Sequence, residues 1–339
     1  MLRKSVLFVT GVLVTLVGLE CMLQLLPVPS ATMAGYYIDP AIETYPPNHR
    51  FTVATGWDLK NAHHHETNNF GFVDARNFVP DPTAIAVIGD SYVEANMLAE
   101  EHRIGPQLEA LVNGGPVYSM GVPGTSLLDY AHRARFAHEQ WGVQQFVIVV
   151  ETGDVRQMLC GSGNHARDCV DADTLELRQV TPPQPGLLKR VMRHSAMAQY
   201  LFSQLRIQPG KWFKELVSPQ ARKVKPATVK AAADPVDATK ASRLIDRFIA
   251  SMPSTSHPPV IVINVSHFSG DIQAWNQVHM EMLADKARAA GMQVVALAPV
   301  FARWEASSPL SLAVGPYDKH WNATAHRLAA EAVAHRLGK

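Results

Sequence analysis

The chain has 339 residues, of which 47% are hydrophobic and 18% are charged, and its formal net charge at pH 7 is +1. This length allows two domains, or one large domain with an insertion, and the composition is typical of a globular protein with a proper core. A balanced charge provides no basic field for nucleic acid, so we expect no nucleic-acid partner.

The N-terminal segment has the composition of a membrane anchor. Two basic residues precede an apolar run over Val6–Leu19, and Glu20 is the only charge between that basic pair and Pro27. The stretch is just long enough to span a bilayer. Positive charge before it places the N-terminus in the cytoplasm. We therefore predict a single-pass signal anchor over residues 1–26, with the remaining chain outside the cytoplasmic membrane.

A cleaved signal peptide is the alternative interpretation of this segment. Thr32-Met33-Ala34 would be an acceptable cleavage site. It lies far from the end of the apolar run, and this distance favours an anchor that is not cleaved.

Residues 27–83 contain many prolines and show poor periodicity, so we expect an extended lead-in rather than a domain. Within it, His63 and His65 would share one face of an extended chain, but this pair alone does not favour a metal site. The stretch Asn68–Phe72 has a turn at Gly71 with aromatic residues on either side. We expect it to pack against the body of the protein.

A short apolar run over Ile85–Ile88 predicts a strand that is buried on both faces of a parallel sheet. Gly89 and Asp90 end this run, and Ser91 follows where a strand would lead into a helix. Such a turn can present a hydroxyl at the carboxyl edge of the sheet, beside helix N–H groups that suit an oxyanion. The alternative is an ordinary turn whose serine caps the next helix.

Further apolar runs alternate with helical stretches along the chain. The predicted strands are Pro116–Met120, Phe146–Val150, Val260–Asn264 and Gln293–Leu297. Strands that alternate with helices predict an α/β fold in which helices cover both faces of a parallel sheet.

The alternation of strands and helices stops between the third and fourth strands. We interpret this region, over about residues 155–259, as an insertion and a candidate helical cap. It holds a predicted helix over Leu187–Leu205 and a basic stretch with Arg222, Lys223, Lys225 and Lys230. A solvated connector is the favoured interpretation of the basic stretch.

Cys160 and Cys169 enclose a short loop in this insertion. In an oxidising compartment outside the membrane, such a pair predicts a disulfide. A metal site is less favoured, because only His165 offers a third ligand of the right kind.

The C-terminal region provides a candidate base for the serine. Asp318 and His320 precede Asn322, which is a plausible N-cap for an apolar helix over residues 323–337. A carboxylate two residues before a histidine can hold its ring in one tautomer. A base that takes a proton from a serine needs this restraint.

Four blocks in this order resemble the SGNH (GDSL-type) hydrolase family: Gly89-Asp90-Ser91-Tyr92, a glycine ending the second strand, a Gly-Asp turn after the third, and a terminal Asp-x-His-x-Asn. The resemblance covers Ala84 to Gly338, with the insertion unmatched. It implies a flavodoxin-like parallel sheet in a domain over residues 84–339.

Carried over residue by residue, the resemblance implies that Ser91 is the nucleophile, His320 the general base and Asp318 the acid that orients it. Gly121 and the Ser91 backbone N–H would donate to the oxyanion. The asparagine donor of the family falls on Asp154 here, and this is a departure from the family pattern.

Membrane-anchored members resemble proteins that add or remove O-acetyl groups on bacterial cell-surface or exported polysaccharides. The resemblance therefore implies an acylated glycan substrate, an acyl-serine intermediate and no metal or cofactor. A membrane protein that donates acyl groups is a further partner that this branch allows. Two alternatives remain: a catalytically weak glycan-binding component of a polysaccharide export or modification assembly, which Asp154 would favour, and a lipid or thioester hydrolase.

Overall fold

The computed structural model describes residues 2–162, 167–181, 186–205, 207, 236–265, 274–315 and 318–338. The chain divides into two compact units. The anchor unit comprises Met1–Thr32, Arg50–His65 and Pro183–Ala233, and the sheet unit comprises Met33–His49, Glu66–Pro182 and Asp234–Lys339. Each unit therefore draws on segments that are far apart in the sequence.

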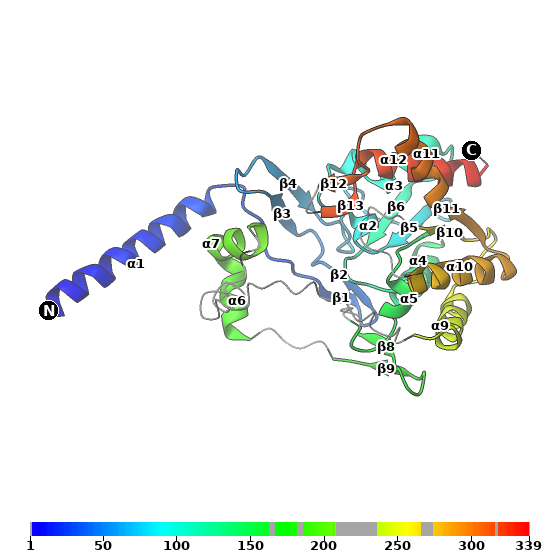
Figure 1. The fold of residues 1–339 in the computed structure, drawn as a ribbon, viewed down its shortest axis with the longest axis horizontal. Coiled ribbons are helices and arrows are strands. Elements are labelled where there is room, and N and C mark those ends of the chain that lie inside the picture. The colour runs from blue at the N-terminus through cyan, green and yellow to red at the C-terminus, as the bar shows by residue number, and fades with distance from the viewer. Residues whose placement is uncertain are drawn as a thin grey trace. The chain divides into compact units, whose positions relative to one another are not determined.

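A five-stranded sheet forms the centre of the sheet unit (Figure 1). All neighbouring strands are parallel, and their spatial order is β11-β10-β7-β5-β6. Counted by appearance in the chain, this order is 2-1-3-4-5 from one edge, which is the flavodoxin-like arrangement. The predicted α/β fold is therefore confirmed. The five strands are β5 (Ile85–Gly89), β6 (Val117–Gly121), β7 (Gln145–Val150), β10 (Val260–Ile263) and β11 (Gln293–Ala296).

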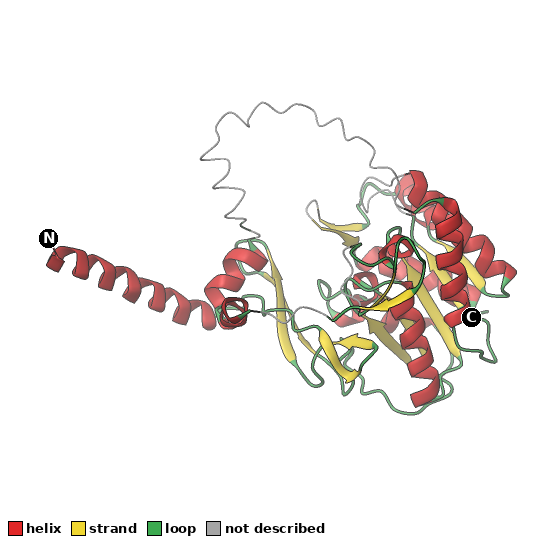
Figure 2. Cartoon of the chain, turned by 90° about the horizontal axis from the view of Figure 1, so that it is seen from below, coloured by secondary structure: helices red, strands yellow, loops and turns green. Residues whose placement is uncertain are grey.

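Helices cover both faces of this sheet (Figure 2). On one face lie α4 (Leu127–Trp141), α9 (Ala238–Ser251) and α10 (Ala274–Ala289). On the other face lie α3 (Ile104–Leu111), α11 (Ala298–Ser307) and α12 (Ala323–Arg336). The short 3₁₀-helix η1 (Glu100–His102) precedes α3.

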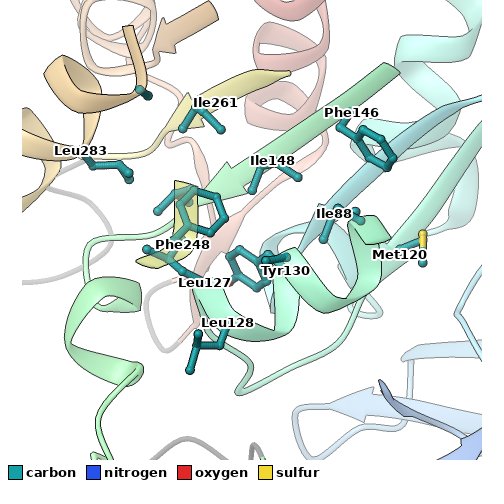
Figure 3. Packing of buried hydrophobic residues seen from close by; sticks show 14 of the residues in the cluster. Ile88, Met120, Leu127, Leu128, Tyr130, Phe146, Ile148, Phe248, Ile261 and Leu283 are labelled. Atoms are coloured by element: carbon teal, nitrogen blue, oxygen red, sulfur yellow. The ribbon is translucent and has the colours of Figure 1, made fainter. Parts of the chain in front are cut away.

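The alternation of side chains along the strands accounts for this two-sided core. In β5, Ala86 and Ile88 pack in the cluster that includes α4 and α9, whereas Ile85 and Val87 pack in the cluster that includes α3 and α12. Figure 3 shows Ile88 and Ile148 from adjacent strands on the first of these faces. Because both faces are covered, the strands appear in the sequence as uninterrupted apolar runs.

The region between β7 and β10 contains several short elements and one helix, α9, that packs on a face of the sheet. The small elements in the sheet unit are α5 (Asp154–Gln157) and the hairpin of β8 (Asp168–Val170) and β9 (Leu177–Gln179). At the end of this region, α9 packs against both α4 and α10. It is therefore the crossover helix between two neighbouring parallel strands.

The helix predicted over Leu187–Leu205 is divided into three consecutive segments, which belong to the anchor unit. Ser195 interrupts it, because its side chain accepts the N–H of Ala198 and starts a new helix. The segments are α6 (Leu187–His194), α7 (Ala196–Ala198) and the π-helical η2 (Gln199–Gln204). His165, Arg222, Lys223, Lys225 and Lys230 lie outside the described residues.

Cys160 and Cys169 form the predicted disulfide, which joins the segment after α5 to β8. The third cysteine, Cys21, is free and exposed.

The segment predicted as an extended lead-in forms two hairpins, of β1 (Gly35–Asp39) with β2 (Ile42–Thr44) and of β3 (Arg50–Thr55) with β4 (Asn61–Glu66). These strands are short and β4 is mostly polar, so no apolar alternation reveals them in the sequence. After them, Phe72 is fully buried in the core of the sheet unit, as expected for the aromatic turn.

The N-terminal helix α1 spans Leu2–Gln24. It is long and apolar enough to cross a membrane, a property that signal sequences share. Near its end, Glu20 accepts hydrogen bonds from the Ser195 hydroxyl and from the N–H groups of Ala196 and Met197. The last turns of α1 are therefore joined to α7 within the anchor unit.

Candidate active site

The sharp turn after β5 presents Ser91 at the carboxyl edge of the sheet. β5 ends at Gly89, Asp90 follows, and Ser91 is the first residue of the short helix α2 (Ser91–Glu94). A Cβ at position 89 would lie 2.5 Å from a side-chain carbon of α2, so the close packing of this helix requires glycine. The Asp90 carboxylate accepts the N–H of Tyr92 at 2.9 Å and caps the helix.

A buried arginine from α4 holds the strand ends next to this turn. Arg133 is 1% exposed, and its Nη1 donates to the carbonyls of Gly89 at 2.7 Å and Met120 at 2.5 Å. Its Nη2 donates to Thr125 Oγ1 at 2.6 Å. Asp129 contributes the largest compensating negative charge. One guanidinium therefore joins the carboxyl ends of β5 and β6.

The last hairpin of the chain carries the candidate base. It pairs β12 (Ala313–Gly315) with β13 (Asp318–Trp321). Directly after it, Asn322 accepts a backbone N–H in the first turn of α12 at 3.1 Å and donates to the Ser311 carbonyl at 2.6 Å. The predicted N-cap is confirmed. Because Trp321 is fully buried, the strand that bears the histidine is fixed at this end.

Three side chains from distant parts of the sheet unit form a chain of two hydrogen bonds. His320 Nε2 lies 2.9 Å from Ser91 Oγ, and His320 Nδ1 lies 2.6 Å from Asp318 Oδ1. Because the carboxylate is an acceptor, Nδ1 carries the proton and Nε2 is left to accept the serine proton. The serine and the histidine are 229 positions apart, and the fold brings them together with Asp318.

The surroundings of His320 keep the imidazole basic and accessible. Burial acts to lower the pKa of His320, but the hydrogen bond and the charge of Asp318 raise it above its ordinary value of 6.5. The carboxyl groups of Asp90 and Glu151 add to this rise. One face of the ring packs against Tyr92, with the ring centroids 4.9 Å apart. The side chain of His320 remains 33% exposed, so solvent or a substrate can reach it.

Gly121 lies inside β6, and the direction of its N–H follows from the strand ladder. Val122 donates to β5, whereas the N–H of Ser119 donates to Asp74 at the outer edge. By this alternation the Gly121 N–H points to the outer edge, away from the strand that leads to Ser91. A Cβ at position 121 would lie 2.1 Å from a backbone nitrogen of α2. The geometry gives Gly121 a packing role and does not favour it as an oxyanion donor.

Asp154 is a buried acid rather than an open side chain of the site. It begins α5, is 0% exposed, and its Oδ2 accepts hydrogen bonds from Tyr130 Oη at 3.0 Å and the Glu151 N–H at 2.8 Å. Burial, together with the charge of Asp90, raises the pKa of Asp154 well above its ordinary value. This placement does not favour Asp154 as a substitute for the asparagine donor of the family, and its place in the site stays a prediction.

Several buried groups that hold the site together were not predicted from the sequence. Besides Arg133, Glu94 accepts a hydrogen bond from Tyr45 Oη at 2.5 Å, and Asn264 Nδ2 donates to Glu151 Oε2 at 2.5 Å. Glu151 and Asn264 directly follow buried strands, where binding residues gather, and this position is a signal that points to them. No comparable signal marks Arg133 or Tyr45.

No family model and no curated protein matches the chain. Solved structures of similar fold include an alpha/beta hydrolase enzyme from the metagenome of Lake Arreo, Spain, at 14% identity and a TM-score of 0.40, covering 77% of this chain and 97% of that chain. A member of the lipolytic protein G-D-S-L family from Veillonella parvula is 13% identical, with a TM-score of 0.40 and coverage of 76% and 98%.

A catalytic mutant of an acetylxylan esterase from Geobacillus stearothermophilus is 12% identical to this chain, with a TM-score of 0.41 and coverage of 77% and 96%. At these identities and TM-scores, the similarity assigns no activity and no substrate to this chain.

The charge of Asp318 should be visible in the pH dependence of any reaction that uses His320 as a base. Only the neutral imidazole accepts a proton, so kcat/KM should rise with pH through an apparent pKa above 6.5. Asp318→Asn removes the charge that raises the pKa of His320. The acid limb should therefore move to lower pH, while the plateau falls by up to about 10⁴-fold.

The matched control for that pH profile is Glu151→Gln. Burial raises the pKa of Glu151 to about 7, so this side chain carries little charge over the acid limb, and its replacement should move the limb less. Initial rates with a nitrophenyl ester across pH 5–9 measure both variants. An acid limb that stays in place or moves upward in Asp318→Asn would contradict the assignment of His320 as the base.

The burial of Asp154 has a consequence for stability. Its pKa is raised in the folded protein, so the stability it contributes is present below its unfolded pKa and declines as pH rises toward the folded value. Asp154→Asn keeps a carbonyl acceptor and stays neutral. Its advantage over the wild type should grow with pH, by up to about 1.4 kcal/mol per pH unit.

Melting temperatures of Asp154→Asn and wild type at pH 5 and pH 9 measure this effect, and the ester rate should stay unchanged. An equal difference in melting temperature at both pH values would show that Asp154 is not held neutral in the core.

Proposed function

We propose that this protein catalyses reactions of carboxylic esters through a covalent acyl-serine intermediate. The observation that carries the proposal is the alignment of Ser91, His320 and Asp318, with 2.9 Å from hydroxyl to imidazole and 2.6 Å from imidazole to carboxylate. A nucleophile within hydrogen-bond reach of a base, which a third group orients, is the arrangement that activates a serine.

In the first half-reaction, Ser91 Oγ attacks the ester carbonyl carbon while its proton passes to His320 Nε2. The resulting tetrahedral intermediate collapses, the bond to the leaving oxygen breaks, and Nε2 returns its proton to the departing alcohol. An ester of Ser91 remains. In the second half-reaction, water or another hydroxyl gives its proton to Nε2 and attacks the carbonyl carbon of this ester. The new tetrahedral intermediate collapses, the bond from that carbon to Ser91 Oγ breaks, and Nε2 returns the proton to Ser91 Oγ. Asp318 stabilises the imidazolium in both halves.

The oxyanion of the intermediate requires donors that point at it from the nucleophile turn. The N–H of Ser91 lies in the first turn of α2, where backbone N–H groups have no partner within the helix. This supports the Ser91 N–H as one donor. Gly124, in the loop that follows β6, has φ 72° and is half-buried, and it is a further candidate.

The nucleophile can be tested directly. A fluorophosphonate probe should label the wild-type chain on Ser91, and Ser91→Ala should lose the labelling together with ester hydrolysis, by roughly 10⁴-fold or more. Thr125→Ser serves as a control that keeps a hydroxyl at the neighbouring loop and should leave labelling intact. Unchanged nitrophenyl acetate hydrolysis by Ser91→Ala would overturn the proposal, whereas a wild-type chain that neither labels nor hydrolyses the ester would favour the glycan-binding alternative.

For the substrate, we propose an O-acylated polysaccharide on the bacterial cell surface or in export. Two features support a location outside the cytoplasm: the apolar helix α1 and the disulfide between Cys160 and Cys169. A helix that stays in the inner membrane would hold the sheet unit on the periplasmic side, where such glycans are modified. A tether also suits an enzyme that receives acyl groups from a membrane partner, and this consideration favours transfer over hydrolysis.

The direction of acyl transfer can be measured on the full chain in detergent with an activated acetyl donor. Transfer requires that a sugar hydroxyl outcompete water for the acyl-serine, so acetylated oligosaccharide should form faster than free acetate. Incubation without the sugar is the control. Acetate release at a rate that the sugar does not change would identify an esterase instead.

A further inference from the structure

The helix α6 (Leu187–His194) divides its residues sharply between two faces. At 3.6 residues per turn, Leu187, Leu188, Val191 and Met192 fall within an arc of about 140°. The remaining residues, which occupy the opposite arc, are all basic side chains: Lys189, Arg190, Arg193 and His194.

The apolar face of α6 is open. Leu187 is 70% exposed, Leu188 72% and Val191 60%, so most of the surface of these three side chains is left uncovered by the described part of the anchor unit. Three large apolar side chains are costly to leave in water, at about 25 cal/mol for each Å² of apolar surface. An apolar face opposite a Lys/Arg-rich face is the pattern of helices that lie in a membrane interface.

The position of α6 along α1 fits this interpretation. Val191 and His194 line the same groove, of about 430 Å³, as Leu13 and Val17 of α1. At 1.5 Å per residue, Glu20 lies about 25 Å along the helix from Arg3. The hydrocarbon core of a bilayer is about 30 Å thick. The junction with α7 therefore falls near the boundary between lipid chains and headgroups.

Glu20, the single acidic residue of α1, lies at this boundary and joins α1 to the start of α7. Glu20 binds the Ser195 hydroxyl at 2.8 Å and the N–H groups of Ala196 and Met197 at 2.7 and 3.0 Å. These bonds attach the segment directly after α6 to the end of α1. The main chain around α6 is thus fixed at one depth relative to the helix proposed to span the bilayer.

An exposed tryptophan belongs to the same part of the anchor unit. Trp57, at the tip of the β3–β4 hairpin, is 77% exposed, and its carbonyl accepts a hydrogen bond from Tyr200 of η2 at 2.9 Å. Gln204 of η2 donates to the neighbouring Gly56 carbonyl at 2.6 Å. An exposed indole on a segment tied to η2 is consistent with the Trp enrichment of membrane interfaces.

We propose that α6 is an interfacial helix that lies on the outer leaflet of the membrane beside α1, with its apolar face in the lipid and its basic face toward anionic headgroups. This proposal rests on the anchor that belongs to the proposed function. A helix lying in the interface would fix the orientation of the anchor unit on the membrane surface, which a single spanning helix alone does not do.

The test uses the full chain with Cys21→Ser, so that an introduced cysteine is the only free thiol beside the disulfide. An environment-sensitive NBD label is attached at Leu188→Cys on the apolar face, or at Arg190→Cys as the matched control on the basic face. Each protein is reconstituted in vesicles of phosphatidylcholine, alone or with phosphatidylglycerol.

The label at position 188 should show blue-shifted emission and be quenched by chain-brominated lipid, and phosphatidylglycerol should strengthen both effects. The label at position 190 should respond to aqueous iodide. The double variant Lys189→Gln/Arg193→Gln should lose the dependence on phosphatidylglycerol. Equal quenching of both labels by iodide, in vesicles that carry the protein, would overturn the proposal.

Flotation of the vesicles and fluorophosphonate labelling of Ser91 separate the possible failures. Protein that floats and labels but shows a water-exposed position 188 contradicts only the interfacial helix. Protein that labels but does not float contradicts the anchor, and the interfacial helix with it. Protein that floats with position 188 in lipid but does not label contradicts the ester chemistry and supports the membrane proposal.

Discussion

The buried guanidinium of Arg133 joins the end of β5, which leads directly into the turn that bears Ser91, to the end of the adjacent strand β6. A charge that is 1% exposed is tolerated because backbone carbonyls, a hydroxyl and nearby carboxyl groups satisfy it. Replacing it with an apolar side chain would leave the carbonyls of Gly89 and Met120 without this donor. The position of Ser91, directly beyond Gly89, depends on this junction.

The position of His320 depends on a second set of contacts, near the C-terminal end of the sheet unit. His320 is useful as a base only if its hairpin stays in place, and the capping and carbonyl contacts of Asn322 fix that hairpin against α12. Asp318 then sets the tautomer of His320. Burial lowers the pKa of the imidazole, and the Asp318 carboxylate raises it again. The contacts of Arg133 and of Asn322 therefore support the two segments that bring Ser91 Oγ within 2.9 Å of His320 Nε2.

Features that depend on local sequence pattern can be predicted from the sequence alone. Apolar runs such as Ile85–Ile88 predict the parallel sheet, which is confirmed. Strand ends and a helix cap draw attention to Ser91, Asp318 and His320, whose side chains lie within hydrogen-bond distance in turn, and their catalytic roles stay predictions. Gly121 and Asp154 were assigned by resemblance, and their orientations depend on ladder alternation and burial that spacing does not reveal. Arg133 lies in an ordinary helical pattern, so its role appears only when the strands that it joins are placed in space.

The central claim is that an ester of Ser91 forms during turnover. It is tested by mixing the full chain with nitrophenyl acetate, quenching in acid within the first turnovers, and analysing the peptide that contains Ser91 by mass spectrometry. We expect one acetyl group on Ser91, which is absent in Ser91→Ala and strongly reduced in His320→Gln. Turnover without acetylation of Ser91, or with a kinetically competent acetyl group on another residue, would contradict the assignment of Ser91 as the nucleophile.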